Sequence, residues 1–209
     1  MENNRYGLYY NHKTIGDVLL IEFKPNEYPT RVEKHDNVVV LYDNDDLVGI
    51  NIFNISDIIK IKADGFIHHL NNEVTDVLNS LLTSKGLKPL PYLKDSGFRI
   101  AKITDIEEHP DSDHLHICKV DVGEKEPLQI VCGAFNARQD LKCVCAMPYT
   151  FMPNGKQIVP GKLMKVESFG MLCSGRELGL KGYENIHGLL EINDESLKVG
   201  DDFFIDYKG

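Results

Sequence analysis

The stretch that decides the fold of this chain is residues 116–132, which read HICKVDVGEKEPLQIVC. Side chains that suit a buried face alternate with exposed ones over residues 116–122 and again over 128–132. This two-residue period is typical of a half-buried β-strand. Gly123 and Pro127 bound the segment between the two strands and predict a turn there. The stretch therefore predicts two consecutive strands of a small sheet.

The sequence on either side adds further strands. Phe98 and Ile100 share one parity, whereas Ile103 takes the other, and such a switch is typical of a β-bulge or a coiled barrel strand. Residues 142–147 form another predicted strand, and one of its faces carries Cys143, Cys145 and Met147. Residues 188–192 and 202–205 supply the closing strands.

A short helix is predicted before the closing strands. Ser174 and Glu177 have the spacing of a capping box, which marks a helix start. Short strands at regular spacing with one short helix predict an all-β OB-fold barrel over residues 98–209. This fold binds oligonucleotides on one strand face and its flanking loops.

The first ninety residues have a different character. Residues 37–42 and 47–53 are apolar runs joined by an Asp/Asn cluster, which predicts a β-hairpin. Apolar residues over 74–82 recur with the spacing of one helix face, and Gly86 is a plausible C-cap. We therefore expect an α+β N-terminal domain at residues 1–90, a small sheet plus one helix. Its role is not indicated.

Residues 91–97 are predicted to be a linker. Together with the residues just before them they read LKPLPYLKDSG, and the two prolines and the final glycine interrupt both helix and sheet. The chain is thus expected to comprise two domains, which 209 residues can accommodate.

Composition restricts the function classes. The formal net charge of -9 argues against a protein that coats nucleic acid indiscriminately. No apolar run approaches the ~18 residues of a membrane helix, and no secretory signal is visible at Met1 to Tyr6. We therefore expect a cytoplasmic protein with no membrane partner, in which the five cysteines are reduced.

One segment of this acidic chain is locally basic. Residues 138–181 hold seven basic and three acidic side chains. The basic ones are Arg138, Lys142, Lys156, Lys162, Lys165, Arg176 and Lys181. Such donors suit phosphates, although chance clustering on a solvated surface remains an alternative. Four aromatic rings lie among or beside them, and these either stack on unpaired bases or fill the barrel ends. The four are Phe135, Tyr149, Phe151 and Phe169.

Metal binding and catalysis have little support. Residues 109–116 contain three histidines and two aspartates, and Cys143 and Cys145 could complete a zinc site. The shared strand face with Met147 favours buried core cysteines instead. Glycine-rich phosphate loops and hydrolase motifs are absent from the sequence, and Cys173 is expected in the barrel wall. No metal, cofactor or catalytic residue is predicted.

Three ordered blocks carry a resemblance to a known family. They are HPDSDHLHICKVDVG at residues 109–123, LQIVCGAFNAR at 128–138 and KLMKVESFGMLCSGRELGL at 162–180. This part of the chain resembles the tRNA-binding domain of EMAP-type proteins and of the bacterial phenylalanyl-tRNA synthetase beta chain. With its N-terminal domain, the whole chain resembles the stand-alone YtpR-type tRNA-binding proteins.

The resemblance implies an OB-fold that binds tRNA. The family's Ser-x-Gly-Met signature maps onto Ser168, Gly170 and Met171, its basic residues onto Lys162 and Lys165, and its asparagine onto Asn136. The family often has glycine at the position of Lys165 and a hydrophilic residue at that of Phe169. From the residues and the resemblance together, the candidate tRNA-binding residues are Asn136, Arg138, Lys156, Lys162, Lys165, Ser168, Gly170, Met171 and Arg176.

Our first hypothesis is therefore a non-enzymatic tRNA-binding protein, driven by shape and charge with little sequence readout. An aminoacyl-tRNA synthetase is a candidate partner, and a homodimer is a candidate assembly. The alternative is a protein-docking module that retains the OB-fold without physiological RNA binding. A tRNA hydrolase acting through Cys173 or the histidines is a third and weaker hypothesis.

Overall fold

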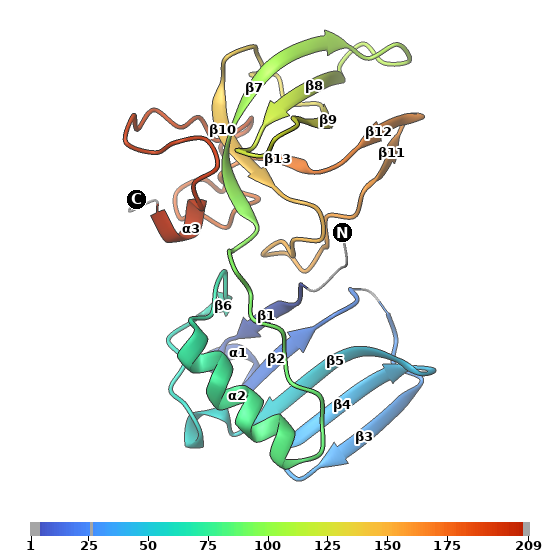
Figure 1. The fold of residues 1–209 in the computed structure, drawn as a ribbon, viewed down its shortest axis with the longest axis vertical. Coiled ribbons are helices and arrows are strands. Elements are labelled where there is room, and N and C mark those ends of the chain that lie inside the picture. Colours follow the sequence, from blue (N-terminus) through green and yellow to red (C-terminus); the bar gives the residue numbers. More distant parts are fainter. Residues whose placement is uncertain (1–4, 26, 207–209) are drawn as a thin grey trace. The chain divides into compact units, whose positions relative to one another are not determined.

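The computed structural model describes residues 5–25 and 27–206. Contacts between Cα atoms divide the chain into two compact units, residues 1–94 and 95–209 (Figure 1). We describe each unit by itself.

The N-terminal unit is a six-stranded antiparallel sheet with strand order β3-β4-β5-β2-β1-β6. Its strands are β1 (Gly7–Tyr10), β2 (Val18–Glu22), β3 (Arg31–His35), β4 (Val38–Asp43), β5 (Asp46–Phe53) and β6 (Gly65–Phe66). Its helices are α1 (His12–Ile15), the short 3-10 helix η1 (Ile55–Asp57) and α2 (Asn72–Ser84). The predicted hairpin is present as β4 and β5.

The predicted helix is α2, which covers one face of this sheet (Figure 1). The Oδ1 atom of Asn71 accepts the N–H of Val74 at 2.9 Å and so caps the helix start. Leu78 and Leu82 are fully buried in a core shared with the strands. Gly86 follows the C-cap with φ of +73°, as a helix-ending glycine should.

The C-terminal unit is a curled antiparallel sheet with strand order β13-β10-β7-β8-β9 and a separate hairpin, β11–β12. The strands are β7 (Phe98–Glu108), β8 (His116–Asp121), β9 (Leu128–Cys132), β10 (Lys142–Ala146), β11 (Gly161–Leu163), β12 (Val166–Ser168) and β13 (Met171–Cys173). A short helix, α3 (Phe203–Asp206), follows. The predicted fold class, an α+β unit followed by an OB-like barrel with a short helix, is confirmed.

Strand β7 is long and curled, and it contains a β-bulge. The pairing with β8 shifts register between Ile103 and Asp105. This bulge lies further along the strand than the predicted change of face, which falls between Ile100 and Ile103. The switch itself arises because β7 is buried on both faces: Ile100 and Ala101 are neighbours and both are fully buried. Phe98 lies on the same face as Ile100. The centroid of its ring is 5.0 Å from the centroid of the Phe204 ring in α3.

The curl closes where the end of β12 meets β9. The Ser168 hydroxyl accepts the backbone N–H of Val131 at 3.1 Å. The Phe169 N–H donates to the carbonyl of Gln129 at 2.9 Å, and the Gln129 amide donates to the carbonyl of Glu167 at 2.9 Å. These bonds satisfy part of the otherwise open edge of β9.

Three local predictions were wrong. The capping-box bonds between Ser174 and Glu177 form, at 2.7 to 3.2 Å, but turns follow rather than a helix, because Gly179 and Gly182 have positive φ. Residues 188–192 are not a strand but a coil, fixed by isolated bonds such as Leu190 N–H to the Cys173 carbonyl at 2.9 Å. The predicted strand at 202–205 is largely α3.

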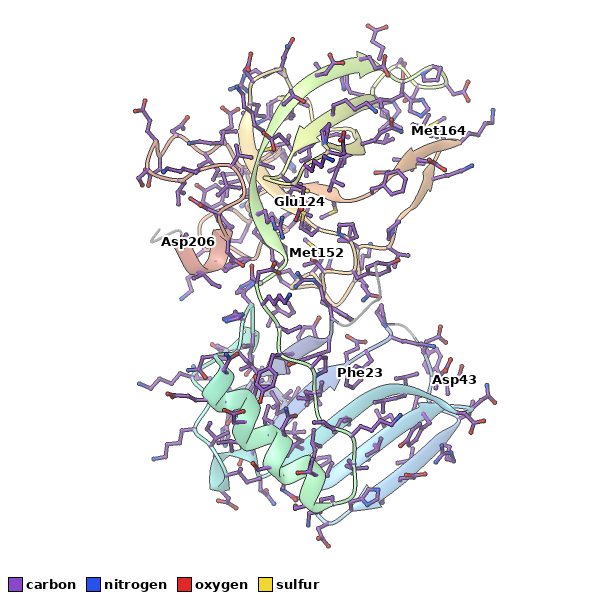
Figure 2. All side chains as sticks on the ribbon, in the orientation of Figure 1. Phe23, Asp43, Glu124, Met152, Met164 and Asp206 are labelled. Carbon is purple, nitrogen blue, oxygen red and sulfur yellow. The ribbon has the colours of Figure 1, made fainter. Side chains whose placement is uncertain are left out.

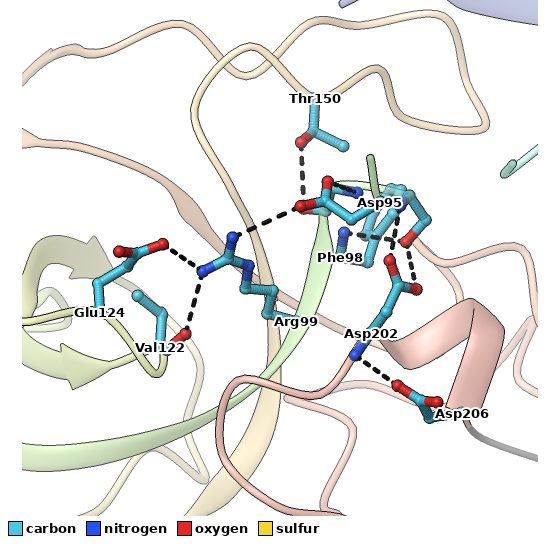
Figure 3. A network of polar contacts seen from close by, with 10 residues as sticks. Asp95, Phe98, Arg99, Val122, Glu124, Thr150, Asp202 and Asp206 are labelled. Atoms are coloured by element: carbon cyan, nitrogen blue, oxygen red, sulfur yellow. Dashed lines mark hydrogen bonds and ion pairs between the residues drawn. The ribbon is translucent and has the colours of Figure 1, made fainter. Parts of the chain in front are cut away.

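Asp202 explains why a helix forms there, and it connects the end of the unit to its beginning (Figure 3). Its Oδ1 accepts the N–H of Phe204 at 3.0 Å, at the start of α3. Both of its oxygens also accept hydrogen bonds from Ser96, at 2.6 and 2.7 Å. Nearby, Arg99 donates to Glu124 at 2.6 Å. This network anchors the first strand of the barrel.

Candidate nucleic-acid interface

The hairpin β11–β12 presents the predicted basic residues. Leu163 pairs with Val166, so Met164 and Lys165 form a two-residue turn. Both have positive φ, 45° and 72°, as a type I′ hairpin turn requires. Glycine adopts this conformation most easily, but this chain has a lysine at the second position of the turn. Figure 2 labels Met164 on this hairpin.

Three of the predicted cations are exposed and have no salt-bridge partner among the described residues. They are Lys156, Lys162 and Arg176. Lys165 forms an ion pair with Asp111 at 3.1 Å, but its side chain is 88% exposed. Such a surface pair contributes little stability, so a phosphate can replace the carboxylate as the partner of Lys165 at small cost.

Arg138, by contrast, already forms an ion pair within the protein. Its two terminal nitrogens donate to the two oxygens of Glu191 at 2.8 and 2.7 Å. The Arg138 guanidinium, followed by the Asn136 amide, lowers the pKa of Glu191 to about 2. Lys142 likewise donates to the carbonyls of Asp194 and Leu197. These cations hold the segment after residue 188 in place.

Asn136 has the same structural task. Its Oδ1 accepts the N–H of Leu189 at 2.8 Å, and its Nδ2 donates to the Leu189 carbonyl at 3.1 Å. Nδ2 also donates to Glu191 at 3.0 Å. The amide therefore fixes a coil segment more than fifty residues away, and little of its hydrogen-bonding capacity is left for a ligand.

The Ser-x-Gly-Met signature is also partly architectural. Ser168 makes the closing bond to β9 described above. A Cβ atom on Gly170 would lie 3.1 Å from the Ala146 carbonyl oxygen and 3.2 Å from Cδ1 of Ile130, so a side chain there would fit tightly against both. Met171 is half-buried on β13 and lines a cavity.

That cavity has a volume of about 300 Å³. Its lining includes Cys132 and Ala134 at the end of β9, Met171 on β13, and Arg176. A neighbouring cavity of about 360 Å³ is lined by Phe135, Tyr183 and the segment 186–191. The two cavities share the stretch 186–189 as a common wall.

The aromatic residues divide between the two predicted roles. Phe151 is 2% exposed and fills the core, whereas Phe135 is 80% exposed beside the second cavity. Tyr183, Ile186 and His187 were not predicted as site residues. Their only sequence signal is an aromatic, an isoleucine and a histidine in a glycine-rich coil, which does not distinguish a cavity wall from a loop.

Cys132 lines the first cavity, whereas the other four cysteines are fully buried. The hydrogen bond that Cys118 donates lowers the pKa of the Cys132 thiol, and the Ala134 N–H, at 3.5 Å, acts in the same direction. Burial opposes both. Cys132 is therefore the most readily ionised thiol of the unit.

The structure gives no support to the histidine-rich turn as a metal site. His109 is 3% exposed, and its Nδ1 accepts the N–H of Asp111 at 3.1 Å, which shapes the turn. Within residues 5–25 and 27–206, no group of three or more His, Cys, Asp or Glu side chains could hold a metal ion. Nor does any helix in these ranges have the length and apolarity to cross a membrane.

Comparison with known proteins assigns the chain to a family. The family described as "Putative tRNA binding domain" matches residues 98–202, which include β7 to β13 and both cavities. The chain belongs to this family. A second family, described as a domain of unknown function, matches residues 25–90 in the N-terminal unit.

Relatives agree with the assignment. The "Putative tRNA-binding protein YtpR" of Bacillus subtilis (strain 168) is 36% identical over 199 residues, which cover 93% of this chain and 98% of that protein. The phenylalanine–tRNA ligase beta subunit of Aromatoleum aromaticum is 46% identical over 132 residues, 61% of this chain but 16% of the subunit. The same subunit of Methylococcus capsulatus is 50% identical over 97 residues, 46% of this chain and 12% of the subunit.

Proposed function

We propose that the C-terminal unit binds tRNA without catalysing a reaction, and that cations around strand β9 contact its phosphates. The observation that carries this proposal is that several basic side chains of a tRNA-binding family domain are exposed and lack strong ion-pair partners. Lys156, Lys162 and Arg176 are exposed and unpaired in the described part of the chain, and Lys165 has only a surface partner. Phosphate contacts by such side chains supply affinity and orientation but little sequence information.

The proposal is tested by the salt dependence of binding. Each phosphate neutralised by a lysine contributes ~0.7 to ~0.9 to the slope of log K against log[salt]. We expect wild-type protein to bind labelled bulk tRNA in fluorescence anisotropy with a steep slope. The double variant Lys162→Ala/Lys165→Ala should bind more weakly, with a slope reduced by up to about 1.8.

The matched control is Lys60→Ala/Lys62→Ala, which removes two exposed lysines from the N-terminal unit. It changes the net charge equally but leaves the hairpin intact, so its slope should stay close to that of wild type. Equal losses in the two variants would mean that net charge, rather than the hairpin, controls binding. Absence of tRNA binding at low salt would refute the proposal.

A protein-docking module is the second candidate function. It is favoured by the commitment of Arg138 and Lys142 to internal partners, which leaves fewer cations than the sequence offers. On this alternative the partner is an aminoacyl-tRNA synthetase or a second copy of the chain. Co-sedimentation with phenylalanine–tRNA ligase and sedimentation equilibrium of the chain alone test these two partners, each without added RNA.

We also propose that residues 1–90 and 98–209 are separate domains joined by a linker at 91–97. Limited proteolysis is the direct test, because a linker between two folded domains is cut first. Cleavage in the more exposed part of this linker, residues 91–94, that yields two resistant fragments is the expected result, because Ser96 is buried and bonded to Asp202. First cleavage inside either domain would contradict it.

A further inference from the structure

The two cavities of the C-terminal unit adjoin along a shared wall, residues 186–189, and the second of them has aromatic side chains in its lining. We define the aromatic groove by Phe135, Tyr183, Ile186, His187 and Gly188, which line the second cavity. Ile186, His187 and Gly188 also line the first cavity, whose other wall includes Arg176. Phe135 is 80% exposed and Ile186 is 50% exposed. Two large apolar side chains in the lining of the second cavity therefore face solvent.

Both aromatic rings of the groove rest on glycines, which makes the groove preorganised. A Cβ atom on Gly188 would lie 2.9 Å from Cε1 of Phe135, so the ring edge packs directly on this backbone. A Cβ atom on Gly175 would lie 2.2 Å from Cδ1 of Tyr183. One edge of each ring therefore contacts glycine backbone. The rest of the ring can be reached by a ligand, as stacking of a base requires.

The groove offers one exposed cation to a phosphate. Glu191 lies in the wall but is neutralised by Arg138. One oxygen of Glu177 accepts the N–H and the hydroxyl of Ser174 at 2.8 and 2.7 Å. Arg176 is exposed, and the described structure gives it no ion-pair partner. The Ser174 bonds orient Glu177 but do not remove its charge, so Arg176 is the cation of this wall that a phosphate can approach.

We propose that the aromatic groove takes one unpaired nucleobase of the bound RNA, stacked on Phe135, with an adjacent phosphate at Arg176. This inference rests on the proposed function and adds to it a preference for single-stranded nucleotides. The second cavity, which Phe135 lines, has a volume of about 360 Å³, at the lower end of ordinary small-ligand cavities, as a single base requires. Aromatic stacking is tolerant of sequence because every base has a π-face.

The position of the groove fits phosphate contacts at the hairpin. Hairpin β11–β12 bonds to β9 at Gln129, and the first cavity begins at Val131 to Gly133. Four residues of strand span ~13 Å. A single strand that follows β9 would thus contact the hairpin lysines with its backbone and reach the groove within a few nucleotides.

The decisive experiment compares Phe135→Ala with wild type on two probes, an unstructured single-stranded 12-nucleotide RNA and a blunt RNA duplex of equal length. Loss of one stacked base should raise the Kd for the single strand about 5- to 100-fold. The Kd for the duplex should stay within about twofold, because its bases are not available. The slope of log K against log[salt] should not change, since no charge is removed.

Three controls make the result specific. Phe135→Tyr keeps an aromatic face and should bind like wild type, whereas Phe135→Leu keeps only apolar bulk and should resemble Phe135→Ala. Tyr28→Ala removes a ring of 89% exposure from the N-terminal unit and should have no effect. Because Phe135 is so exposed, its replacement should leave the thermal unfolding midpoint nearly unchanged.

A footprint on Cys132 gives independent evidence. The single-stranded RNA should slow alkylation of Cys132 by iodoacetamide, measured by peptide mass spectrometry, because a nucleotide with its phosphate at Arg176 covers the first cavity, which Cys132 also lines. If tRNA binds but Phe135→Ala has no effect on the single strand, the groove inference is wrong while the proposed function stands. If wild type binds neither tRNA nor the 12-nucleotide RNA, both fail.

Discussion

Hairpin β11–β12 and the aromatic groove adjoin the same edge strand, β9, but they are constructed differently. The hairpin is local: two three-residue strands and a two-residue turn carry its lysines. The groove is assembled from distant segments, with Asn136 bonded to Leu189 and Gly175 beneath Tyr183. Single substitutions in the hairpin should therefore be tolerated, whereas substitutions at the residues that hold the groove segments together, Asn136 and Gly175, should destabilise the fold.

The largest expected effect is that of Asn136→Ala. The substitution leaves the N–H and carbonyl of Leu189 without their partner in a buried segment, which should lower the free energy of unfolding by about 2 to 4 kcal/mol. Urea unfolding measures it. Asn154→Ala removes one exposed loop bond, to Lys156 N–H, and should cost less than about 1 kcal/mol. Equal costs would contradict the contrast.

A glycine in the groove and a glycine in the hairpin offer a second comparison. Gly175→Ala would place a Cβ atom within 2.2 to 2.9 Å of the Tyr183 ring and Cβ, and such overpacking typically costs about 1 to 3 kcal/mol. Gly161→Ala, in β11, meets nothing closer than 3.8 Å. It should be nearly neutral in thermal unfolding. A destabilised Gly161→Ala would show that the hairpin is less tolerant than we infer.

A smaller effect is expected from Glu191→Gln, and it should depend on pH. The pKa of Glu191 is about 2 in the folded protein, below its ordinary 4.5, so its ion pair stabilises the fold above pH 4.5 and is lost as pH falls through 2. The unfolding midpoint of Glu191→Gln should be lower than that of wild type at pH 7. The difference should shrink as the pH falls below 4.5.

The control for this prediction is Glu195→Gln, which alters an exposed carboxylate a few residues further along the same coil. It should follow wild type at every pH. A difference between Glu191→Gln and wild type that persists unchanged at low pH would mean that the ion pair is not its source.

The finest distinction concerns Cys132 at the end of β9. Hydrogen bonds from Cys118 and from Ala134 N–H lower the pKa of its thiol, so Cys132 should be alkylated before the four fully buried cysteines, and at a lower pH than an ordinary thiol. Cys118→Ala removes the largest of these effects and should slow alkylation at pH 7. Faster alkylation of Cys173 would contradict this order.

The contrast also explains what could be predicted from the sequence. The strands around residues 116–132 could be predicted from the local alternation of side chains, and they are present as β8 and β9. The cluster of basic residues that includes the hairpin lysines could be recognised from the local charge alone. The roles of Asn136 and Arg138 were not foreseen, because their partners Leu189 and Glu191 lie more than fifty residues away. Helix α3 was mistaken for a strand, since its Asp202 cap is recognisable only beside Ser96.

The groove could not be predicted for the same reason. Phe135 follows a strand and Tyr183 lies in a coil, and only the contacts with Gly188 and Gly175 make them walls of one cavity. Sequence reasoning had offered Phe135 and Phe151 the same two roles. The fold separates them, because Phe151 is buried while Phe135 remains open to solvent.

The measurement that tests the account most directly is a salt series of binding to single-stranded RNA for three proteins: wild type, Lys162→Ala/Lys165→Ala and Phe135→Ala. If the hairpin contacts phosphates and the groove a base, the lysine variant should have a shallower slope of log K against log[salt]. The Phe135 variant should give a line parallel to that of wild type, displaced to weaker binding. A Phe135→Ala line that coincides with wild type, or a lysine variant with an unchanged slope, would contradict the account.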